Sequence, residues 1–129
     1  MDLYTQTTQQ IKITVKPAPI PENSDPERSV FAFSYTIRIE NTGEEVVQLL
    51  ERHWIIRSAE SQIAEVIGPG VVGLQPILKG RETFEYTSGA VIHDPVGSME
   101  GSYTFSGADG RRFRVTIPRF DLIYEMVLH

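Results

Sequence analysis

Residues 31–40 have the sequence FAFSYTIRIE, and this stretch decides the fold class. Its odd-numbered positions are aromatic or aliphatic (Phe31, Phe33, Tyr35, Ile37 and Ile39), whereas its even-numbered positions are mostly polar. Side chains of a strand point alternately to its two faces, so a period of two predicts a strand with one buried and one exposed face. We therefore expect these residues to form a strand that covers a core.

The same alternation recurs along the chain, in residues 11–16, 46–57, 63–67, 81–87, 99–106 and 112–117. Short polar connections separate these segments, and no segment has a clear helical pattern. Asn41-Thr42-Gly43-Glu44 suits a hairpin, and Ala108-Asp109-Gly110 is the tightest hairpin signal because Asp-Gly accepts a positive φ. The sequence predicts an all-β fold, an immunoglobulin/fibronectin type III-like β-sandwich of about seven antiparallel strands.

The strand expected at residues 46–57 changes its phase midway. Val47 and Leu49 follow one alternation, whereas Leu50, Trp54 and Ile56 follow the other. An extra residue in one strand of a pair shifts the alternation by one position. We predict a β-bulge near Leu49–Leu50.

Prolines mark two further boundaries. Four prolines between Pro17 and Pro26 exclude a central strand or a helix interior, so this stretch is expected to be a connecting loop. Pro118 is expected to end the last strand. The apolar residues of the 120–129 tail are compatible with an extra edge strand or with a short helix.

Composition limits the class of protein. The 129 residues predict a single domain, 1–129, in which residues 1–10 form a flexible N-terminus. The chain has no cysteine and no apolar run long enough for a bilayer, so we expect a cytoplasmic protein without disulfides or membrane contact. A net charge of −5 argues against nucleic acid as a partner. Oligomeric state stays open.

Residues 68–73, Gly68-Pro69-Gly70-Val71-Val72-Gly73, have the glycine spacing of a dinucleotide-binding fingerprint. That fingerprint requires a helix immediately after the glycines, and Pro76 and Gly80 prevent one of useful length. Two readings remain open. The glycines either permit tight turns and close backbone approach, or they bind an anion through backbone N–H groups.

Arg52-His53-Trp54 lies on the strand expected at 46–57. Trp54 is expected in the core, and a regular strand then points His53 to the opposite face. The candidate ligand-binding residues are Gly68, Gly70, Gly73, Arg52 and His53. We assign no catalytic residue, no cofactor and no metal site, since the three histidines are far apart in the sequence.

Several motifs in a fixed order resemble the ApaG family over residues 11–128. They are Arg52-His53-Trp54, Gly68-x-Gly70-Val71-Val72-Gly73, Gln75-Pro76, Phe84-x-Tyr86-Thr87-Ser88-Gly89, Gly97-x-Met99-x-Gly101-x-Tyr103 and Phe113-x-Val115-x-Ile117-Pro118. One departure is Ala90, where members of the family often have cysteine. The resemblance implies a fibronectin type III-like sandwich. It also implies an interaction module, because eukaryotic F-box proteins and a polymerase-interacting protein carry the same domain.

The residues and the resemblance together predict a non-catalytic binding module. Its partner is a protein or a small anionic ligand, recognised through the glycine-rich loop and the adjacent strand. The alternative is a nucleotide- or pyrophosphate-binding protein, or an accessory protein of Co²⁺/Mg²⁺ homeostasis. That alternative follows from the family's link to cobalt and magnesium resistance and to a neighbouring diadenosine tetraphosphate hydrolase gene.

Overall fold

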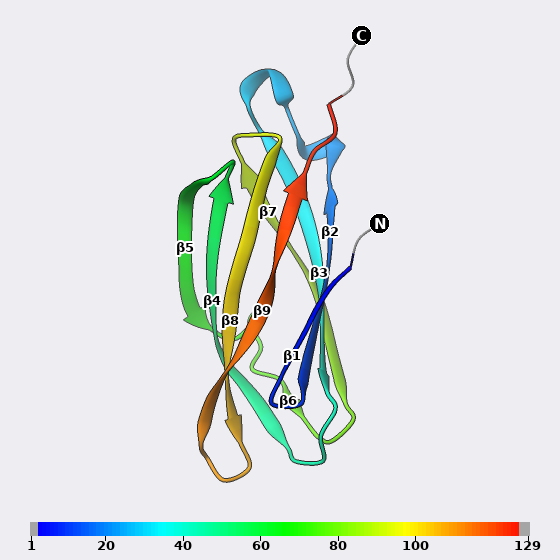
Figure 1. Cartoon of the computed structure of the whole chain (residues 1–129), viewed down its shortest axis with the longest axis vertical. Coiled ribbons are helices and arrows are strands. Elements are labelled where there is room, and N and C mark those ends of the chain that lie inside the picture. The colour runs from blue at the N-terminus through cyan, green and yellow to red at the C-terminus, as the bar shows by residue number, and fades with distance from the viewer. Residues whose placement is uncertain (1–2, 127–129) are drawn as a thin grey trace.

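The computed structural model describes residues 3–126 and places nine strands in two antiparallel sheets that face each other (Figure 1). One sheet has the strand order β1-β2-β3-β7, and the other has the order β5-β4-β8-β9 with β6 paired to β4. The strands are β1 (Tyr4–Thr8), β2 (Ile11–Pro19), β3 (Phe31–Asn41), β4 (Val47–Ser58), β5 (Ser61–Pro69), β6 (Ile77–Leu78), β7 (Thr83–Ile92), β8 (Val96–Gly107) and β9 (Arg112–Ile123). The predicted sandwich is confirmed, with nine strands rather than seven.

The core lies between the two sheets and is built from the inward positions of the alternating strands. On β3, Ile37 and Ile39 are fully buried, and Phe33 is nearly so. The Trp54 ring packs between the sheets, with its centroid 5.4 Å from that of Tyr35 and 5.9 Å from that of Phe120. Burial of such large apolar side chains is the main favourable term in folding. Trp54 is a core residue, as predicted.

The N-terminal segment forms a strand where a flexible terminus was expected. Residues 4–8 pair with β2 in a continuous register, from Tyr4 opposite Val15 to Thr8 opposite Ile11. Tyr4 also packs its ring 6.1 Å from that of Phe120. The other side chains of β1 are mostly exposed and polar, so the strand shows no alternation that the sequence could reveal.

Two predicted proline boundaries are wrong for the same physical reason. β2 continues through Pro17 to Pro19, because its pairing with β1 ends with Tyr4 opposite Val15 and no other strand of residues 3–126 pairs with this edge. Two short 3₁₀ turns follow, η1 (Pro21–Asn23) and η2 (Pro26–Arg28). A strand tolerates a proline at a position where no neighbouring strand would accept a hydrogen bond from the backbone N–H that proline lacks.

Pro118 does not end the last strand either, because it sits in a bulge. Ile117 pairs with Gly101 and Phe120 pairs with Met99, so Pro118 and Arg119 together oppose the single residue Glu100. β9 therefore runs on to Ile123 as one strand, which settles the described part of the tail. Residues 127–129 lie outside the described residues.

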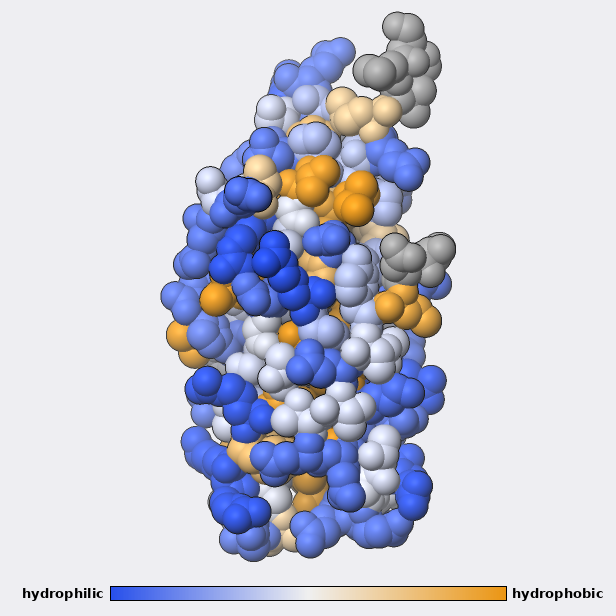
Figure 2. Space-filling view, in the orientation of Figure 1, coloured by the Kyte–Doolittle hydropathy of each residue, from blue (hydrophilic) through white to orange (hydrophobic). Residues whose placement is uncertain are grey.

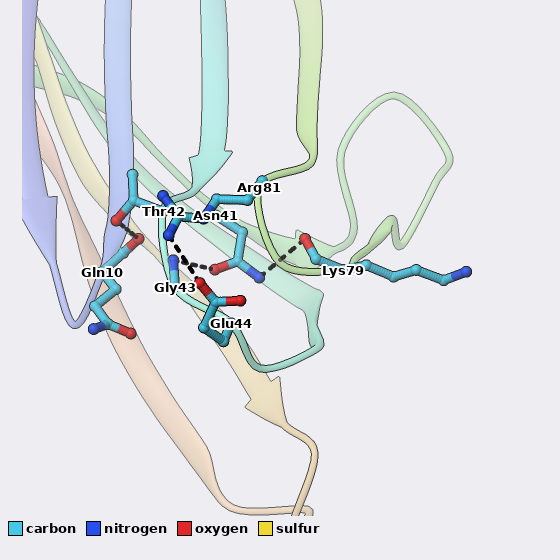
Figure 3. Close-up of polar contacts among 7 residues, drawn as sticks. All are labelled: Gln10, Asn41, Thr42, Gly43, Glu44, Lys79 and Arg81. Carbon is cyan, nitrogen blue, oxygen red and sulfur yellow. Dashed lines mark hydrogen bonds and ion pairs between the residues drawn. The ribbon is translucent and has the colours of Figure 1, made fainter.

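The connection after β3 crosses from one sheet to the other and is not the hairpin that we expected. The buried side chain of Asn41 organises this crossing (Figure 3). Its amide nitrogen donates to the Glu45 carbonyl at 2.7 Å and to the Leu78 and Lys79 carbonyls at 3.2 and 3.3 Å, and its oxygen accepts from the Gly43 N–H. Thus one side chain holds together the β3–β4 connection and the approach to β7.

By contrast, the β8–β9 hairpin at Ala108-Asp109-Gly110 is confirmed.

The two long sides of the sandwich differ. On one side β1 and β2 contact β9, which closes the gap between the sheets. On the other side the edge strands are β5 of one sheet and β7 of the other. Between these two edges the space between the sheets opens to solvent, and two of the predicted site residues, Arg52 and Gly73, line this opening.

Candidate ligand-binding cleft

A cleft of about 340 Å³ opens between the sheets on the side of β5 and β7. Its lining comes from both sheets and from the glycine loop: Tyr35, Arg52, Trp54, Ile56, Val66, Val71, Val72, Gly73, Tyr86, Ser88, Gly89 and Met99. Aromatic side chains of β3, β4 and β7 contribute much of this lining, and Arg52 is its only charged residue. The cleft therefore combines aromatic and aliphatic side chains with about as much polar surface, and it contains one cation.

Arg52 points into the cleft because of the bulge in β4. Leu49 pairs with Phe105 and Glu51 pairs with Thr104, so Leu50 is the extra residue, as the change of phase predicted. After the bulge the even-numbered residues face the other sheet, which puts Arg52 on the same face as Trp54. His53 is on the outer face of β4, where its Nε2 lies 2.6 Å from Oε2 of Glu65.

The same bulge anchors the glycine loop. The carbonyl of Leu50, the unpaired residue, accepts the Gly70 N–H at 2.8 Å and the side-chain amide of Gln75 at 2.9 Å. Val71 and Leu74 then exchange two backbone hydrogen bonds of 2.8 Å. The residues between them, Val72 and Gly73, both have positive φ, which defines a tight turn of the mirror-image hairpin type.

Gly70 is the loop position where a side chain would meet both backbone strain and a steric collision. Its φ is +64°, in the left-handed region. A Cβ added there would collide with the backbone carbonyl of Leu74, whereas a Cβ on Gly73 would meet nothing. The loop glycines thus serve turn geometry and close approach, the first of the two readings left open by the sequence.

Part of the loop backbone is already used within the protein. The N–H groups of Gly70, Val71 and Leu74 are bonded to protein carbonyls and Pro69 has none, whereas among the described residues those of Val72 and Gly73 have no protein acceptor. No helix follows the glycines, since the next element is the two-residue strand β6. The dinucleotide reading is excluded, as Pro76 and Gly80 indicated, and a positive charge in the cleft has to come from a side chain.

Arg52 supplies that charge, and the loop holds it in place. Its Nη1 donates to the Pro69 carbonyl at 2.8 Å and to the Gly70 carbonyl at 3.0 Å. Gly68 lies opposite Arg52 in the register, and its missing side chain leaves room for the guanidinium. Within residues 3–126, Nη2 and Nε donate to no protein atom and no carboxylate lies within 4.0 Å of the guanidinium.

Two tyrosines complete the site, and sequence reasoning did not identify them as site residues. The hydroxyls of Tyr86 and Tyr103 lie 2.5 Å apart in the interior, and Tyr86 also lines the cleft. Burial raises the pKa of both hydroxyls well above the ordinary tyrosine value, so both stay neutral at physiological pH. The alternation in residues 81–87 and 99–106 puts each tyrosine on the apolar face of its strand, but alternation alone does not reveal which inward residues meet across the sandwich.

The structure therefore divides the predicted site residues into two groups. Arg52, Gly68 and Gly70 are in direct contact, and Gly73 lines the same cleft. His53 faces away from it. Within residues 3–126 no group of three or more His, Asp or Glu side chains is arranged to hold a metal ion. In the same part of the chain, no helix has the length and apolar character that crossing a membrane requires.

Comparison with known proteins identifies relatives along nearly the whole chain. Residues 21–107 match the family model described as the ApaG domain. Proteins named ApaG from Thiobacillus denitrificans and Nitrosomonas europaea are 50% and 51% identical, and each alignment covers 94% of the relative and 93% or 92% of this chain. A crystal structure of an ApaA protein from Bordetella pertussis is 44% identical and superposes with a TM-score of 0.87, covering 91% of this chain and 95% of that one.

Proposed function

This chain belongs to the ApaG domain family, and from that premise we propose that it is a non-catalytic binding module whose ligand places an anionic group in the β5/β7 cleft, beside Arg52. The chemistry proposed is recognition of a carboxylate or phosphate oxygen by a guanidinium held on a rigid loop. Arginine suits this task because its planar fork of donors matches the geometry of both oxyanions.

The proposal depends mainly on the solvent exposure and the ion pairing of Arg52, compared with those of the other arginines. Within residues 3–126 only Arg52 and Arg57 are shielded from solvent to an intermediate degree, and the other arginines are exposed. Arg57 is paired with Glu100, whereas none of the described carboxylates pairs with Arg52. A cation that is partly removed from water without a counter-ion favours an anion strongly, since the local dielectric constant is lower than that of water.

The rest of the cleft restricts what the anion is attached to. The largely buried rings of Tyr35, Trp54 and Tyr86 line the cleft near the guanidinium, and the Tyr86 hydroxyl, which is paired with that of Tyr103, can add a neutral hydrogen bond. Val72 at the rim is 56% exposed. These features suit a ligand with an apolar or planar part next to its charge, either a small molecule or the end of a polypeptide.

Titration with pyrophosphate, followed by the amide NMR shifts of the whole chain, tests the proposal. We expect saturable shifts at Val72, Gly73 and Ser88. Arg52→Gln should weaken binding about tenfold or more, because a charge-assisted hydrogen bond contributes about 1.5–3 kcal/mol. Arg114→Gln is the matched control, since Arg114 is exposed on β9 and lies outside the cleft.

Two further titrations show whether the anionic group belongs to a small molecule or to a protein. Nucleotides and diadenosine polyphosphates represent small ligands, and a short peptide with a free C-terminal carboxylate represents a protein partner. Arg52→Lys should retain part of the affinity because it keeps the charge without the fork. Flat spectra at millimolar concentrations of every probe, or equal losses in Arg52→Gln and Arg114→Gln, would refute the proposal.

A further inference from the structure

A second groove, of about 600 Å³, lies on the opposite long side of the sandwich, between the proline-containing end of β2 and the end of β9. We propose that this groove binds a polyproline II segment of a partner protein that carries a basic residue. Its lining shares no residue with that of the β5/β7 cleft, so the proposal is independent of the function proposed above.

The groove exists because β1 is shorter than β2. β1 covers the edge of β2 only as far as Val15, so Pro17 and Pro19 lie beyond it. At the same end, β9 leaves the sheet at Ile123 and continues into Tyr124. Tyr4, the first paired residue of β1, also lines the groove.

Part of the wall of this groove is the Tyr124 ring, which packs against aromatic residues of the core. The Tyr124 ring packs edge-on against those of Phe31 and Phe33, with centroids 5.3 and 6.5 Å apart. Its backbone N–H donates to the Pro95 carbonyl at 2.7 Å. The groove is therefore formed before any ligand arrives, which lowers the entropic cost of binding.

The occupant is not an added β-strand. An edge accepts a strand through a row of alternating N–H and C=O groups, and the prolines at 17 and 19 remove two of the donors from this edge. Surfaces of aromatic and proline rings instead fit the ridges of a polyproline II helix, whose backbone needs no ladder partner and is already ordered when free.

Charge selects among such segments. Asp121 and Glu125 line the groove, and no lysine or arginine does so. Neither carboxylate has a basic partner within 4.0 Å among the described side chains. Figure 2 shows a hydrophobic patch in the upper part of a largely hydrophilic face. Val96 and Ile123, which pair with each other at the ends of β8 and β9, are 51% and 52% exposed. Proline rings beside an arginine or lysine match this combination.

The test is a titration of the full chain with a blocked peptide, acetyl-PPPRPPPRP-amide, followed by amide NMR shifts. We expect saturable shifts at Ala18, Ile123 and Tyr124 with a Kd below about 1 mM, and unchanged signals at Val72 and Gly73. A second peptide has glutamate in place of both arginines, and a third has alternating valine and threonine in place of the prolines. Both should bind at least about fivefold more weakly.

A matched pair of double variants tests the charge. Asp121→Asn with Glu125→Gln should weaken the arginine peptide about fivefold at low salt, since each exposed ion pair contributes up to about 1 kcal/mol. Glu60→Gln with Glu85→Gln makes the same change in net charge at exposed positions away from the groove, and binding should stay within twofold. All four positions are exposed, so all variants should fold.

Three results would overturn the proposal. One is the absence of saturable shifts at several millimolar peptide. Another is equal binding of the valine–threonine peptide, which indicates a strand-like occupant. The third is a concentration-dependent shift of Ala18, Ile123 and Tyr124 without peptide, which indicates a second copy of the chain in the groove.

Discussion

Gly70 and Gly73 have similar backbone angles in one loop, with φ of +64° and +80°, but different surroundings. Gly73→Ala should cost about 1–2 kcal/mol of unfolding free energy, the ordinary penalty of a left-handed alanine. Gly70→Ala adds a collision with the Leu74 carbonyl and should cost roughly 2 kcal/mol more. Urea unfolding of both variants measures the difference. Equal losses would mean that the loop relaxes and that Gly70 is not sterically required.

The Tyr86–Tyr103 pair makes stability depend on alkaline pH. Because burial raises the pKa of both hydroxyls in the folded chain, the unfolded chain loses these protons first, at about pH 10. The free energy of unfolding should therefore fall as pH rises from about 10 to about 12. The variant with Tyr86→Phe and Tyr103→Phe should show a shallower decline in urea unfolding across this range. Parallel declines would contradict the assignment.

At the scale of one element, the bulge in β4 connects sequence to site. Deletion of Leu50 removes the extra residue and brings Leu49 and Glu51 into one unbroken alternation, so Arg52 and Trp54 should keep facing the other sheet. The deletion also removes the carbonyl that accepts from Gly70 and Gln75, so we expect a cooperatively folded variant that is destabilised by about 2–3 kcal/mol in urea unfolding, as monitored by Trp54 fluorescence. Leu50→Ala is the control at the same position and should cost only about 1 kcal/mol, since it keeps this carbonyl and the Leu50 side chain is only partly buried. Equal losses in the two variants would show that the Leu50 carbonyl does not hold the glycine loop.

Strands could be predicted from the sequence where alternating apolar and polar residues continue along the whole strand. The bulge at Leu50 followed from two incompatible phases in one run of residues, and the β8–β9 turn followed from Asp109-Gly110. The ends of β2 and β9 were not predictable, because a proline breaks a strand only where its N–H has a partner. That depends on where the neighbouring strand stops and on the bulge opposite Glu100, neither of which is local in the sequence.

At the scale of the molecule, β1 should be part of the cooperative fold. Deletion of residues 1–9 uncovers the edge of β2 from Ile11 to Val15 and removes Tyr4 from the Phe120 ring. We expect a loss of at least about 2 kcal/mol in unfolding free energy, and association at high concentration because a sheet edge is exposed. Urea unfolding and sedimentation velocity measure both effects, with Thr5→Ala as a neutral exposed control. An unchanged unfolding midpoint would restore the expectation of a flexible N-terminus.

The site was predictable from the sequence only in part. Alternation separated His53 from Trp54, and the glycine loop was expected to act with the strand that carries Arg52. The direct contact of Arg52 with Pro69 and Gly70 depends on the pairing of β4 with β5. The hydroxyl contact between Tyr86 and Tyr103 was not accessible, since it joins strands of different sheets. How two sheets face each other depends on the crossing that Asn41 organises and on the twist of both layers.

The asymmetry of the two long sides also affects hydrogen exchange. Since β5 and β7 are edge strands, one row of amide groups on each has no neighbouring strand. Deuterium should therefore enter β5 and β7 sooner than β3 and β4, which are paired on both sides. A ligand that fills the cleft would slow this uptake selectively on these two strands, so that occupancy becomes measurable without knowledge of the ligand's identity.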